Sequence, residues 1–306
     1  MTNSLAGRTA LITGGAAGLG LATAQSLARS GAKILIVDRN RAAGEAAARE
    51  IVEATPESNV RFFALDLGDL DAIKKFSHER EQENLALDIL INNAGLLPPM
   101  ERAATPLGHE LGVSVVGHYV LTAALLKALH RAPSPRVVTL SSMAHRTATL
   151  PFNDLNQVSD YDPTRAYGVA KLAALTFALE LNRRALAAGS KLASLAAHPG
   201  ISQTGIGVGW NHEGPLPLRY RLARLSMRWA IRYGGQSIEE GMRPTLMAAT
   251  DANACGGMFF GPSGFAEMRG ATRIAKPSKA AQSLSDASRL WTWLESETGV
   301  RYTWPQ

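Results

Sequence analysis

The chain has 306 residues, 46% of them hydrophobic and 19% charged, a composition typical of a soluble globular enzyme with a large core. It lacks both a signal-peptide pattern and any apolar run approaching the ~18 residues of a membrane span. The net charge of +6 is not gathered into the basic stripe of a nucleic-acid-binding protein, and a single cysteine, Cys255, excludes an internal disulfide. We therefore expect a cytoplasmic protein that binds no nucleic acid, and we expect Cys255 to be a small core residue.

Short β-branched segments alternate with longer alanine- and leucine-rich segments, which is typical of strand-helix-strand units on a parallel sheet. Strands are expected at residues 8–13, 33–37, 60–65, 87–91, 136–140, 191–197 and 258–260. Helices are expected at residues 18–30, 41–54, 69–83, 106–131, 162–188 and 283–296. The pattern predicts one α/β domain over residues 1–306, a Rossmann-type doubly wound parallel sheet of about seven strands with helices on both faces.

Residues 205–235 interrupt this alternation with glycines, prolines and Trp210. Their large apolar side chains would suit a substrate lid over a lipophilic alcohol or carbonyl compound. An ordinary packed helix explains the same residues. A basic amphipathic helix on an anionic membrane is a further, less favoured, interpretation.

The first expected strand runs into a glycine-rich turn and then into a helix. The glycines follow the spacing Gly14-x-x-x-Gly18-x-Gly20, which differs from the G-x-G-x-x-G fingerprint. Glycines there let the backbone approach a pyrophosphate, whose charge is met by free N–H groups and the positive end of the helix. A tight turn without a ligand is the alternative. The position at the first strand-to-helix junction favours a nucleotide.

Asp38 and Arg39 follow the second expected strand, about twenty residues beyond the glycine-rich turn. A carboxylate at this point can accept hydrogen bonds from the adenosine ribose of NAD and repels the additional phosphate of NADP. Arg39 has the opposite tendency, because a guanidinium suits a phosphate. The glycine-rich turn contains no further basic residue, so NAD is favoured over NADP.

Tyr167 and Lys171 are four residues apart on an expected helix, which puts a phenol and an ammonium on one face. A free tyrosine ionises near pH ~10, and a nearby positive charge stabilises the phenolate and lowers the pKa. The pair could therefore exchange protons at neutral pH. A half-buried tyrosine beside a solvated lysine gives the same spacing.

Several motifs in order carry a family resemblance. They are the glycine-rich turn, Asn92-Asn93-Ala94-Gly95, Ser141-Ser142 and Tyr167 with Lys171. With them the chain resembles the short-chain dehydrogenase/reductase family over nearly its whole length. Val113 to Tyr119 with Gly117-His118, Ala144-His145 and His198-Pro199-Gly200 resemble the retinol-dehydrogenase-like branch of that family.

The resemblance implies hydride transfer between a nicotinamide cofactor and an alcohol/carbonyl pair. Tyr167 matches the general acid/base, and Lys171 matches the residue that lowers its pKa and binds the nicotinamide ribose. Ser142 matches the serine that hydrogen-bonds the substrate oxygen. The family also implies a homodimer or a homotetramer.

Other positions match the family's binding residues. The implied cofactor contacts are Gly14, Gly18, Leu19, Gly20, Asp38, Arg39, Asp66, Leu67, Asn93, Ala94, Gly95, Pro199, Gly200 and Thr204, with Tyr167 and Lys171. The implied substrate contacts are Ser142, Met143, His145, Tyr167 and Trp210. For Asp66 and Thr204, local caps or turn bonds remain an alternative.

One position departs from the family pattern. Three residues before Gly117 the family usually has an asparagine, which holds a water in the proton relay to the lysine, whereas this chain has Ser114. A serine hydroxyl can still hold a water, although it has fewer hydrogen-bond donors than an asparagine amide. Ser114 is therefore predicted to be a catalytic residue together with Ser142, Tyr167 and Lys171. The departure also leaves open a non-catalytic nucleotide-binding protein that retains the fold.

The seven histidines lack the close spacing of a metal site, so no metal is expected. His118 and His198 are interpreted as structural histidines, and His145 as a residue lining the substrate pocket.

Overall fold

The structure, a computed structural model, describes residues 5–95, 109–156, 159, 161–202 and 235–304. Its strands are β1 (Thr9–Thr13), β2 (Lys33–Asp38), β3 (Val60–Ala64), β4 (Ile89–Asn92), β5 (Arg136–Leu140), β6 (Ala193–Ala197), β7 (Phe259–Pro262) and β8 (Thr272–Ile274). The α-helices are α1 (Gly18–Arg29), α2 (Arg41–Ala54), α3 (Leu70–Gln82), α4 (His109–Leu111), α5 (His118–Ala124), α6 (Leu126–Arg131), α7 (Pro163–Ala187), α9 (Ile238–Gly241), α10 (Arg243–Thr250) and α11 (Leu284–Thr298). The described residues also form three short helical segments, η1 (Gly112–Gly117), η2 (Met143–Arg146) and η5 (Phe265–Glu267).

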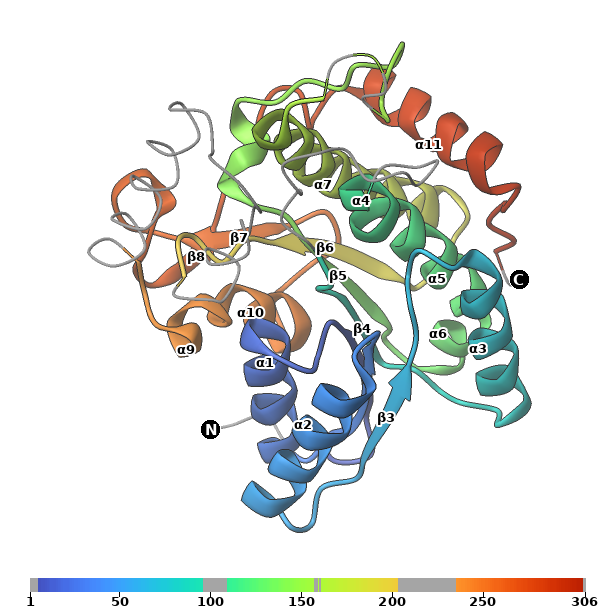
Figure 1. Ribbon diagram of the computed structural model, residues 1–306, viewed down its shortest axis with the longest axis vertical. Coiled ribbons are helices and arrows are strands. Elements are labelled where there is room, and N and C mark those ends of the chain that lie inside the picture. The colour runs from blue at the N-terminus through green and yellow to red at the C-terminus, as the bar shows by residue number, and fades with distance from the viewer. Residues whose placement is uncertain (1–4, 96–108, 157–158, 160, 203–234, 305–306) are drawn as a thin grey trace, which may run out of the picture.

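The strands form one sheet in the order β3-β2-β1-β4-β5-β6-β7-β8, shown in Figure 1. All neighbours pair in parallel except β7 and β8, which are antiparallel. From β1 the chain winds outward through β2 to β3, then returns to place β4 on the other side of β1. The predicted doubly wound parallel sheet is confirmed. Its direction of winding reverses between β1 and β4, where such sheets bind ligands.

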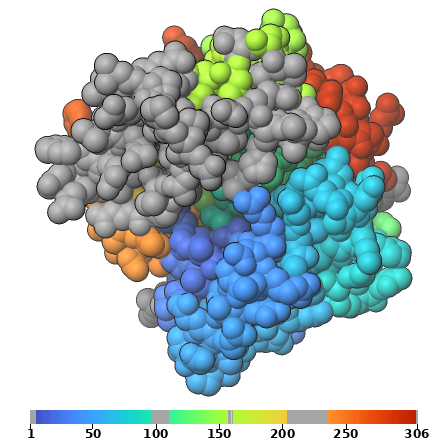
Figure 2. Space-filling model, viewed as in Figure 1, coloured from blue at the N-terminus to red at the C-terminus, as the bar shows by residue number. Residues whose placement is uncertain are grey.

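Consecutive side chains of the strands enter two different cores, because successive residues of a strand point to opposite faces. Ile12 and Ile34 pack in the core that α1, α2 and α10 cover. Leu11 and Leu35 pack in the core that α3, α5, α7 and α11 cover. Burial on both faces explains why the strands read as continuous apolar runs. In the space-filling view of Figure 2, β1 through α3, in blue and cyan, make up the lower part of the visible face.

The eighth strand, β8, was not predicted. It has three residues, too few for a periodic pattern, and it lies at the edge of the sheet with Arg273 and Ile274 exposed. The long helix predicted over residues 106–131 is also wrong in part. The described residues form α4, a π-helical turn η1, then α5 and α6, which are separated at Leu125. A π-turn inserts a residue into an α-helical pattern and is not visible in apolar periodicity.

Residues 284–304 pack on α5 and α7. Trp291 of α11 is 2% exposed and its ring centroid lies 5.3 Å from that of Tyr119. The Tyr119 hydroxyl donates to the Val300 carbonyl at 2.8 Å, and the Tyr302 hydroxyl donates to the Tyr119 carbonyl at 2.9 Å. The C-terminal segment therefore closes the outer side of these helices.

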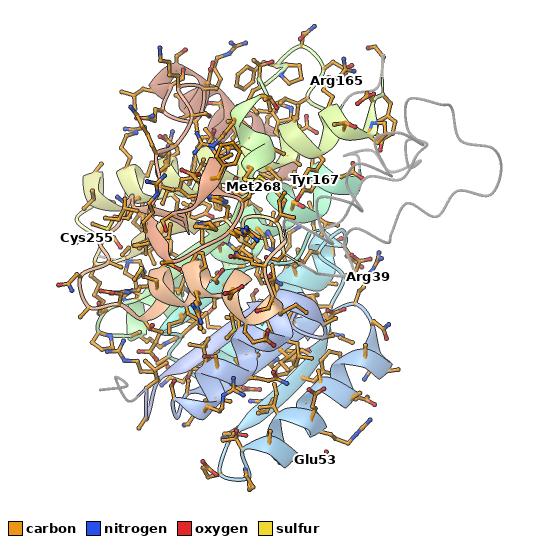
Figure 3. All side chains as sticks on the ribbon, turned by 90° about the vertical axis from the view of Figure 1, so that its left-hand side faces the viewer. Arg39, Glu53, Arg165, Tyr167, Cys255 and Met268 are labelled. Atoms are coloured by element: carbon orange, nitrogen blue, oxygen red, sulfur yellow. The ribbon has the colours of Figure 1, made fainter. Side chains whose placement is uncertain are left out.

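Two further expectations have different outcomes. The predicted lid at 205–235 and Trp210 lie outside the described residues, apart from Gly235. Cys255 is exposed rather than part of the core, because it lies in the turn before β7, and Figure 3 shows it well away from Tyr167.

Within the described residues, no helix combines the length and the apolar character needed to cross a membrane.

Candidate active site

The glycine-rich turn lies at the carboxyl end of β1, against the turn that follows β4. The Asn93 side-chain amide donates to the carbonyls of Thr13 at 2.7 Å and Gly14 at 3.2 Å. A Cβ on Gly20 would overlap the Gly14 carbonyl, so only glycine allows this contact. Ala17 immediately precedes α1 and makes no side-chain cap hydrogen bond, which leaves N–H groups at the positive helix end.

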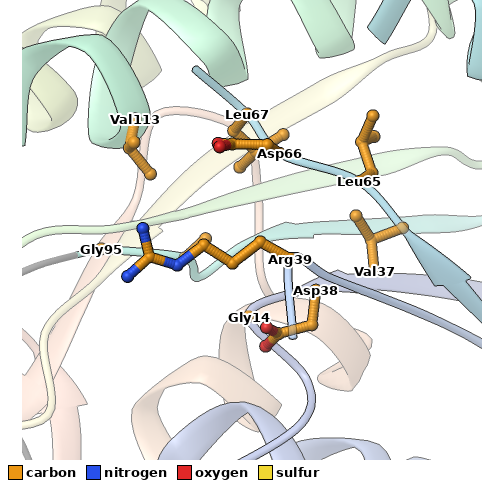
Figure 4. A pocket seen from close by; sticks show the side chains of 10 residues that line it. Gly14, Val37, Asp38, Arg39, Leu65, Asp66, Leu67, Gly95 and Val113 are labelled. Atoms are coloured by element: carbon orange, nitrogen blue, oxygen red, sulfur yellow. The ribbon is translucent and has the colours of Figure 1, made fainter. Parts of the chain in front are cut away.

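A cavity of about 110 Å³ opens between these turns and the ends of β2 and β3 (Figure 4). Its lining consists of Gly14, Val37, Asp38, Arg39, Leu65, Asp66, Leu67, Ala94, Gly95 and Val113. Seven of these residues are predicted cofactor contacts; Val37, Leu65 and Val113 are additional. Figure 4 shows the Arg39 side chain extending across the cavity, with its guanidinium on the side of Gly95.

Asp38 is held at the rim of this cavity by two backbone N–H groups. Its Oδ2 accepts from Ala16 at 3.3 Å, and its Oδ1 accepts from Asn40 at 3.0 Å. Each carboxylate oxygen keeps a second acceptor position for another donor. Asp66 accepts from the Gly68 N–H at 2.8 Å, which is the local turn bond considered as an alternative, and it also lines the cavity.

A buried network joins the first strand to the π-turn. The Thr13 hydroxyl accepts from the N–H groups of Asn93 at 3.0 Å and Ala94 at 2.9 Å. His118 Nδ1 lies 3.0 Å from the Ser114 carbonyl, which can only accept, so Nδ1 carries the proton. His118 Nε2 then accepts from the Thr13 hydroxyl at 2.9 Å. His118 is thus the satisfied structural histidine that was expected, and it fixes the turn that lines the cavity.

Acidification from pH 7 to pH 4 is expected to destabilise the folded protein through two histidines. Burial lowers the pKa of His118 and of His198 from 6.5 to about 4. Below pH 6.5 the unfolded chain binds protons that the folded chain does not, so stability is complete above pH 6.5 and is lost as the pH falls toward 4. Each histidine contributes up to about 3 kcal/mol. Denaturant unfolding at several pH values measures the slope.

His118→Gln is the matched variant, since it removes one of the two titrations. Its unfolding free energy should depend on pH less steeply than that of the wild type. An equal slope in both proteins would contradict the assignment.

Ser142 and Tyr167 meet at the carboxyl end of β5. Their side chains are hydrogen-bonded, and both are half-buried. Burial raises the pKa of Tyr167, and the hydrogen bond from Ser142 opposes that shift. Ser141 points elsewhere, because its hydroxyl donates to the Lys171 carbonyl at 2.8 Å. The prediction of Ser142 rather than Ser141 beside the tyrosine agrees with this geometry.

Lys171 is buried, with 7% of its surface exposed, which removes the interpretation of a solvated lysine. Its Nζ lies 5.8 Å from the centroid of the Tyr167 ring and donates to the Leu140 carbonyl at 3.4 Å. Burial lowers its pKa from 10.5 to about 8. The expected lowering of the Tyr167 pKa by Lys171 is not met, because burial dominates at the tyrosine.

Ser114, Lys171 and Gly95 lie together. A Cβ placed on Gly95 would come within 3.1 Å of Lys171 Nζ and 3.4 Å of Ser114 Oγ. Ser114 is 3% exposed, and its hydroxyl finds no hydrogen-bond partner within the described residues. A buried hydroxyl without a partner is unfavourable unless a water or a ligand satisfies it. Ser114 is thus placed to hold a water beside the lysine.

The remaining predicted residues have mixed placements. Pro199 and Gly200 follow β6, and Met143 is half-buried in η2. The Leu19 side chain packs with Ala22 and Met242, which leaves only its backbone for a phosphate. Thr204 lies outside the described residues.

His145 is not placed on a pocket wall. It is fully buried, its Nδ1 lies 2.6 Å from the Ser142 carbonyl, and its ring packs against Phe259. The helical turn η2 directs the side chain inward. Across the described part of the chain, no group of three or more His, Cys, Asp or Glu side chains is placed to hold a metal.

These features fit a dinucleotide. The close approach of Gly14 and Gly20 leaves room for a pyrophosphate near the uncapped start of α1. Asp38 can accept from a ribose hydroxyl, and the cavity walls at Val37 and Leu65 are apolar.

The sequence matches the family described as short chain dehydrogenase over residues 8–213. The chain belongs to the short-chain dehydrogenase family. As a member of it, the protein is an NAD(P)-dependent oxidoreductase that acts on alcohols or carbonyl compounds. Retinol dehydrogenase 12 of Homo sapiens is 36% identical over 246 residues, 78% of this chain and 76% of that protein. Polyprenol dehydrogenase of Mus musculus is 33% identical, over 87% of this chain and 79% of that one.

Among solved structures, an uncharacterized protein from Mycobacterium paratuberculosis is 35% identical, with a TM-score of 0.76. The match covers 98% of this short-chain dehydrogenase and 96% of that chain. The retinol-dehydrogenase relatives confirm the resemblance to that branch.

Several residues of the site were not assigned a role from the sequence. Val37 and Leu65 are the last residues of the strands expected from the sequence, so their positions could have been inferred from strand ends. Val113 was recognised only as part of a motif. Thr13 and Glu267, which contacts His198, gave no sequence signal because their partners are distant in the chain.

Proposed function

We propose that this short-chain dehydrogenase is an NAD-preferring alcohol dehydrogenase/carbonyl reductase of lipophilic substrates. The observation that carries the proposal is the hydrogen-bonded pair Ser142 and Tyr167 with the buried Lys171 beside it, at the same sheet edge as the glycine-rich turn. The arrangement places the general acid/base Tyr167 next to the predicted dinucleotide-binding site.

Each residue has a separate task. Tyr167 exchanges a proton with the substrate oxygen, while Ser142 donates a hydrogen bond to that oxygen and orients it. Lys171 places a positive charge beside the phenol, and the water that Ser114 is suited to hold would connect the lysine to solvent. A nicotinamide cofactor, when bound, supplies or accepts the hydride. The turn from Asn93 to Gly95 and the segment Pro199–Gly200 would hold it.

Lipophilic substrates are supported by the two named relatives, a retinol and a polyprenol dehydrogenase. The apolar residues at 205–235 support the same class from the sequence. Within the described residues a hollow of about 670 Å³ lies between the segment that follows η2 and the start of α7, the helix that bears Tyr167. Its lining includes Thr147, Pro151, Asn153, Thr164 and Gly168. A cytoplasmic location and a homodimer or homotetramer stay predictions, checked by fractionation and by light scattering.

Turnover tests the function. The protein should oxidise NADH in the presence of a series of ketones and aldehydes of rising chain length, with kcat/KM increasing with length. Reduction of short, polar carbonyl compounds alone would contradict the lipophilic class. NADH binding without turnover on any carbonyl or alcohol would favour the non-catalytic nucleotide-binding alternative.

Asp38→Ala is expected to shift the nucleotide preference toward NADP. The variant removes an acceptor for the ribose hydroxyl and the charge that repels a phosphate, while Arg39 stays available to bind that phosphate. A hydrogen bond to a charged group contributes about 1.5–3 kcal/mol, so the ratio of kcat/KM for NAD to that for NADP should fall by roughly 10–100-fold. Steady-state kinetics with both nucleotides measures it.

Arg39→Ala is the opposite control, which should weaken NADP and spare NAD. A wild-type protein that prefers NADP strongly would show that Asp38, tied to Ala16 and Asn40, does not select the nucleotide.

A further inference from the structure

Glu267 is a buried carboxylate at the centre of a charged cluster near the active site. It is 7% exposed. Its Oε2 accepts from Arg146 at 2.6 Å and lies 3.0 Å from His198 Nε2, and its Oε1 accepts from Arg273 at 3.4 Å. A buried carboxylate needs such partners, because an unpaired charge is strongly unfavourable in the interior.

The backbone at Glu267 is strained. Ala266 has φ of 48° and Glu267 has φ of 59°, a region that residues with a Cβ rarely adopt. Such conformations persist only where the surrounding structure imposes them, and they concentrate at functional sites. The turn is held by the Glu267 N–H, which donates to the Gly264 carbonyl at 2.9 Å.

The first arm of the cluster reaches the serine of the active site. Arg146 is the last residue of η2, whose first residue follows Ser142 directly. The His145 N–H and its Nδ1 both contact the Ser142 carbonyl, and the Ala144 N–H donates to Ser142 Oγ at 3.3 Å. A displacement of Arg146 is thus transmitted along one short turn to Ser142.

The second arm reaches the segment after β6. The Gly200 N–H donates to His198 Nδ1 at 3.3 Å, so the ring proton is on Nε2 and is donated to Glu267. The Ile201 N–H donates to the Met268 carbonyl at 2.8 Å, and a Cβ on Gly200 would overlap that carbonyl. The strained turn and its histidine therefore fix Pro199–Gly200.

We propose that Glu267 is a positioning residue that holds the Ser142 segment and the Pro199–Gly200 segment in one fixed relation. The inference rests on the proposed function, in which the first segment orients the substrate oxygen and the second borders the nicotinamide. A carboxylate bonded to both segments sets the distance between the two reactants. Small errors in that distance slow a reaction by up to about 100-fold.

Arg146 and Arg273 provide a matched pair of variants. Both donate to Glu267, and their side chains are 39% and 53% exposed. Arg146 belongs to the serine segment and also donates to the Lys276 carbonyl at 3.4 Å, whereas Arg273 belongs to the edge strand β8. Arg146→Met and Arg273→Met remove the same charge from the same partner. Only the first should loosen the active site if Glu267 acts by positioning.

Hydrogen exchange of the nucleotide-free protein tests the inference without any activity. In Glu267→Gln, amides 142–146 and 200–201 are both expected to exchange about tenfold faster than in the wild type. In Arg146→Met the first group alone should accelerate, and in Arg273→Met neither should. Unchanged exchange in both groups of a folded Glu267→Gln protein overturns the proposal. So does acceleration in Arg273→Met equal to that in Arg146→Met, which would indicate a loss of overall stability.

Kinetics adds a second readout. Arg146→Met should lower kcat by about 10–100-fold while the Kd for NADH changes less than about threefold, and Arg273→Met should change neither. A wild type without turnover refutes the proposed function, whereas the exchange pattern still decides the role of Glu267. Active wild type with an unaffected Arg146→Met kcat refutes the positioning role alone.

Discussion

Tyr167→Phe is expected to lower kcat by roughly 10²–10⁴-fold, the range for loss of a general acid/base. The substitution removes the only atom of this side chain that can exchange a proton, and it leaves the ring in place on α7. The fold and nucleotide binding should therefore be retained, with Tm and the Kd for NADH close to wild type. Stopped-flow measurement of NADH oxidation, with thermal unfolding alongside, checks both parts.

The neighbouring serines supply a matched control. Ser142→Ala should lower kcat as well, since it removes the hydroxyl bonded to Tyr167. Ser141→Ala should mainly lower stability, because that hydroxyl bonds the Lys171 carbonyl. Near-normal turnover of a folded, NADH-binding Tyr167→Phe protein would exclude the proposed mechanism.

Lys171→Met is expected to abolish turnover and, at pH 7, to raise the free energy of unfolding of the nucleotide-free protein by about 1–3 kcal/mol. At that pH the folded state carries a buried ammonium whose pKa is lowered to about 8. Between pH 8 and 10.5 the unfolded chain binds more protons than the folded chain, so wild-type stability rises with pH through this window. The variant should lack that rise.

Denaturant titrations at pH 7 and pH 10 measure the difference between the two proteins. Lys191→Met is the control, since Lys191 is exposed and its removal should leave stability nearly unchanged. A Lys171→Met protein less stable than the wild type at pH 7 would mean that burial of the ammonium is already compensated. If the Lys171→Met protein is more stable but inactive, the lysine side chain lowers the stability of the fold while it is required for activity.

The repeated alternation of strands and helices was sufficient to predict the doubly wound sheet, because burial on both faces leaves a strong apolar pattern. The site residues at strand ends, Gly14, Asp38, Gly95 and Ser142, were also predictable, as was Tyr167 on the helix α7. The position of each of these residues is set by the strand or helix that carries it, and a local sequence motif is sufficient to predict that element.

What could not be predicted depends on contacts between distant segments. His145 was expected on a pocket wall and lies in the core, because the direction of a side chain in a short helical turn is set by packing against Phe259. The π-turn around Ser114 and the strained turn at Glu267 leave no periodic pattern. Burial raises the pKa of Tyr167, whereas the spacing to Lys171 predicts a lower value. Sequence spacing alone does not show how deeply the tyrosine is buried.

The packing of residues 284–304 has a consequence for the way in which the protein unfolds. Tyr119 and Tyr302 link α5 to this segment, and Trp291 packs in the same core as residues of α5 and α7. Detachment of α11 would therefore expose the core beside the helix that bears Tyr167 and Lys171. Release of α11 and loss of the active site should coincide in one cooperative opening.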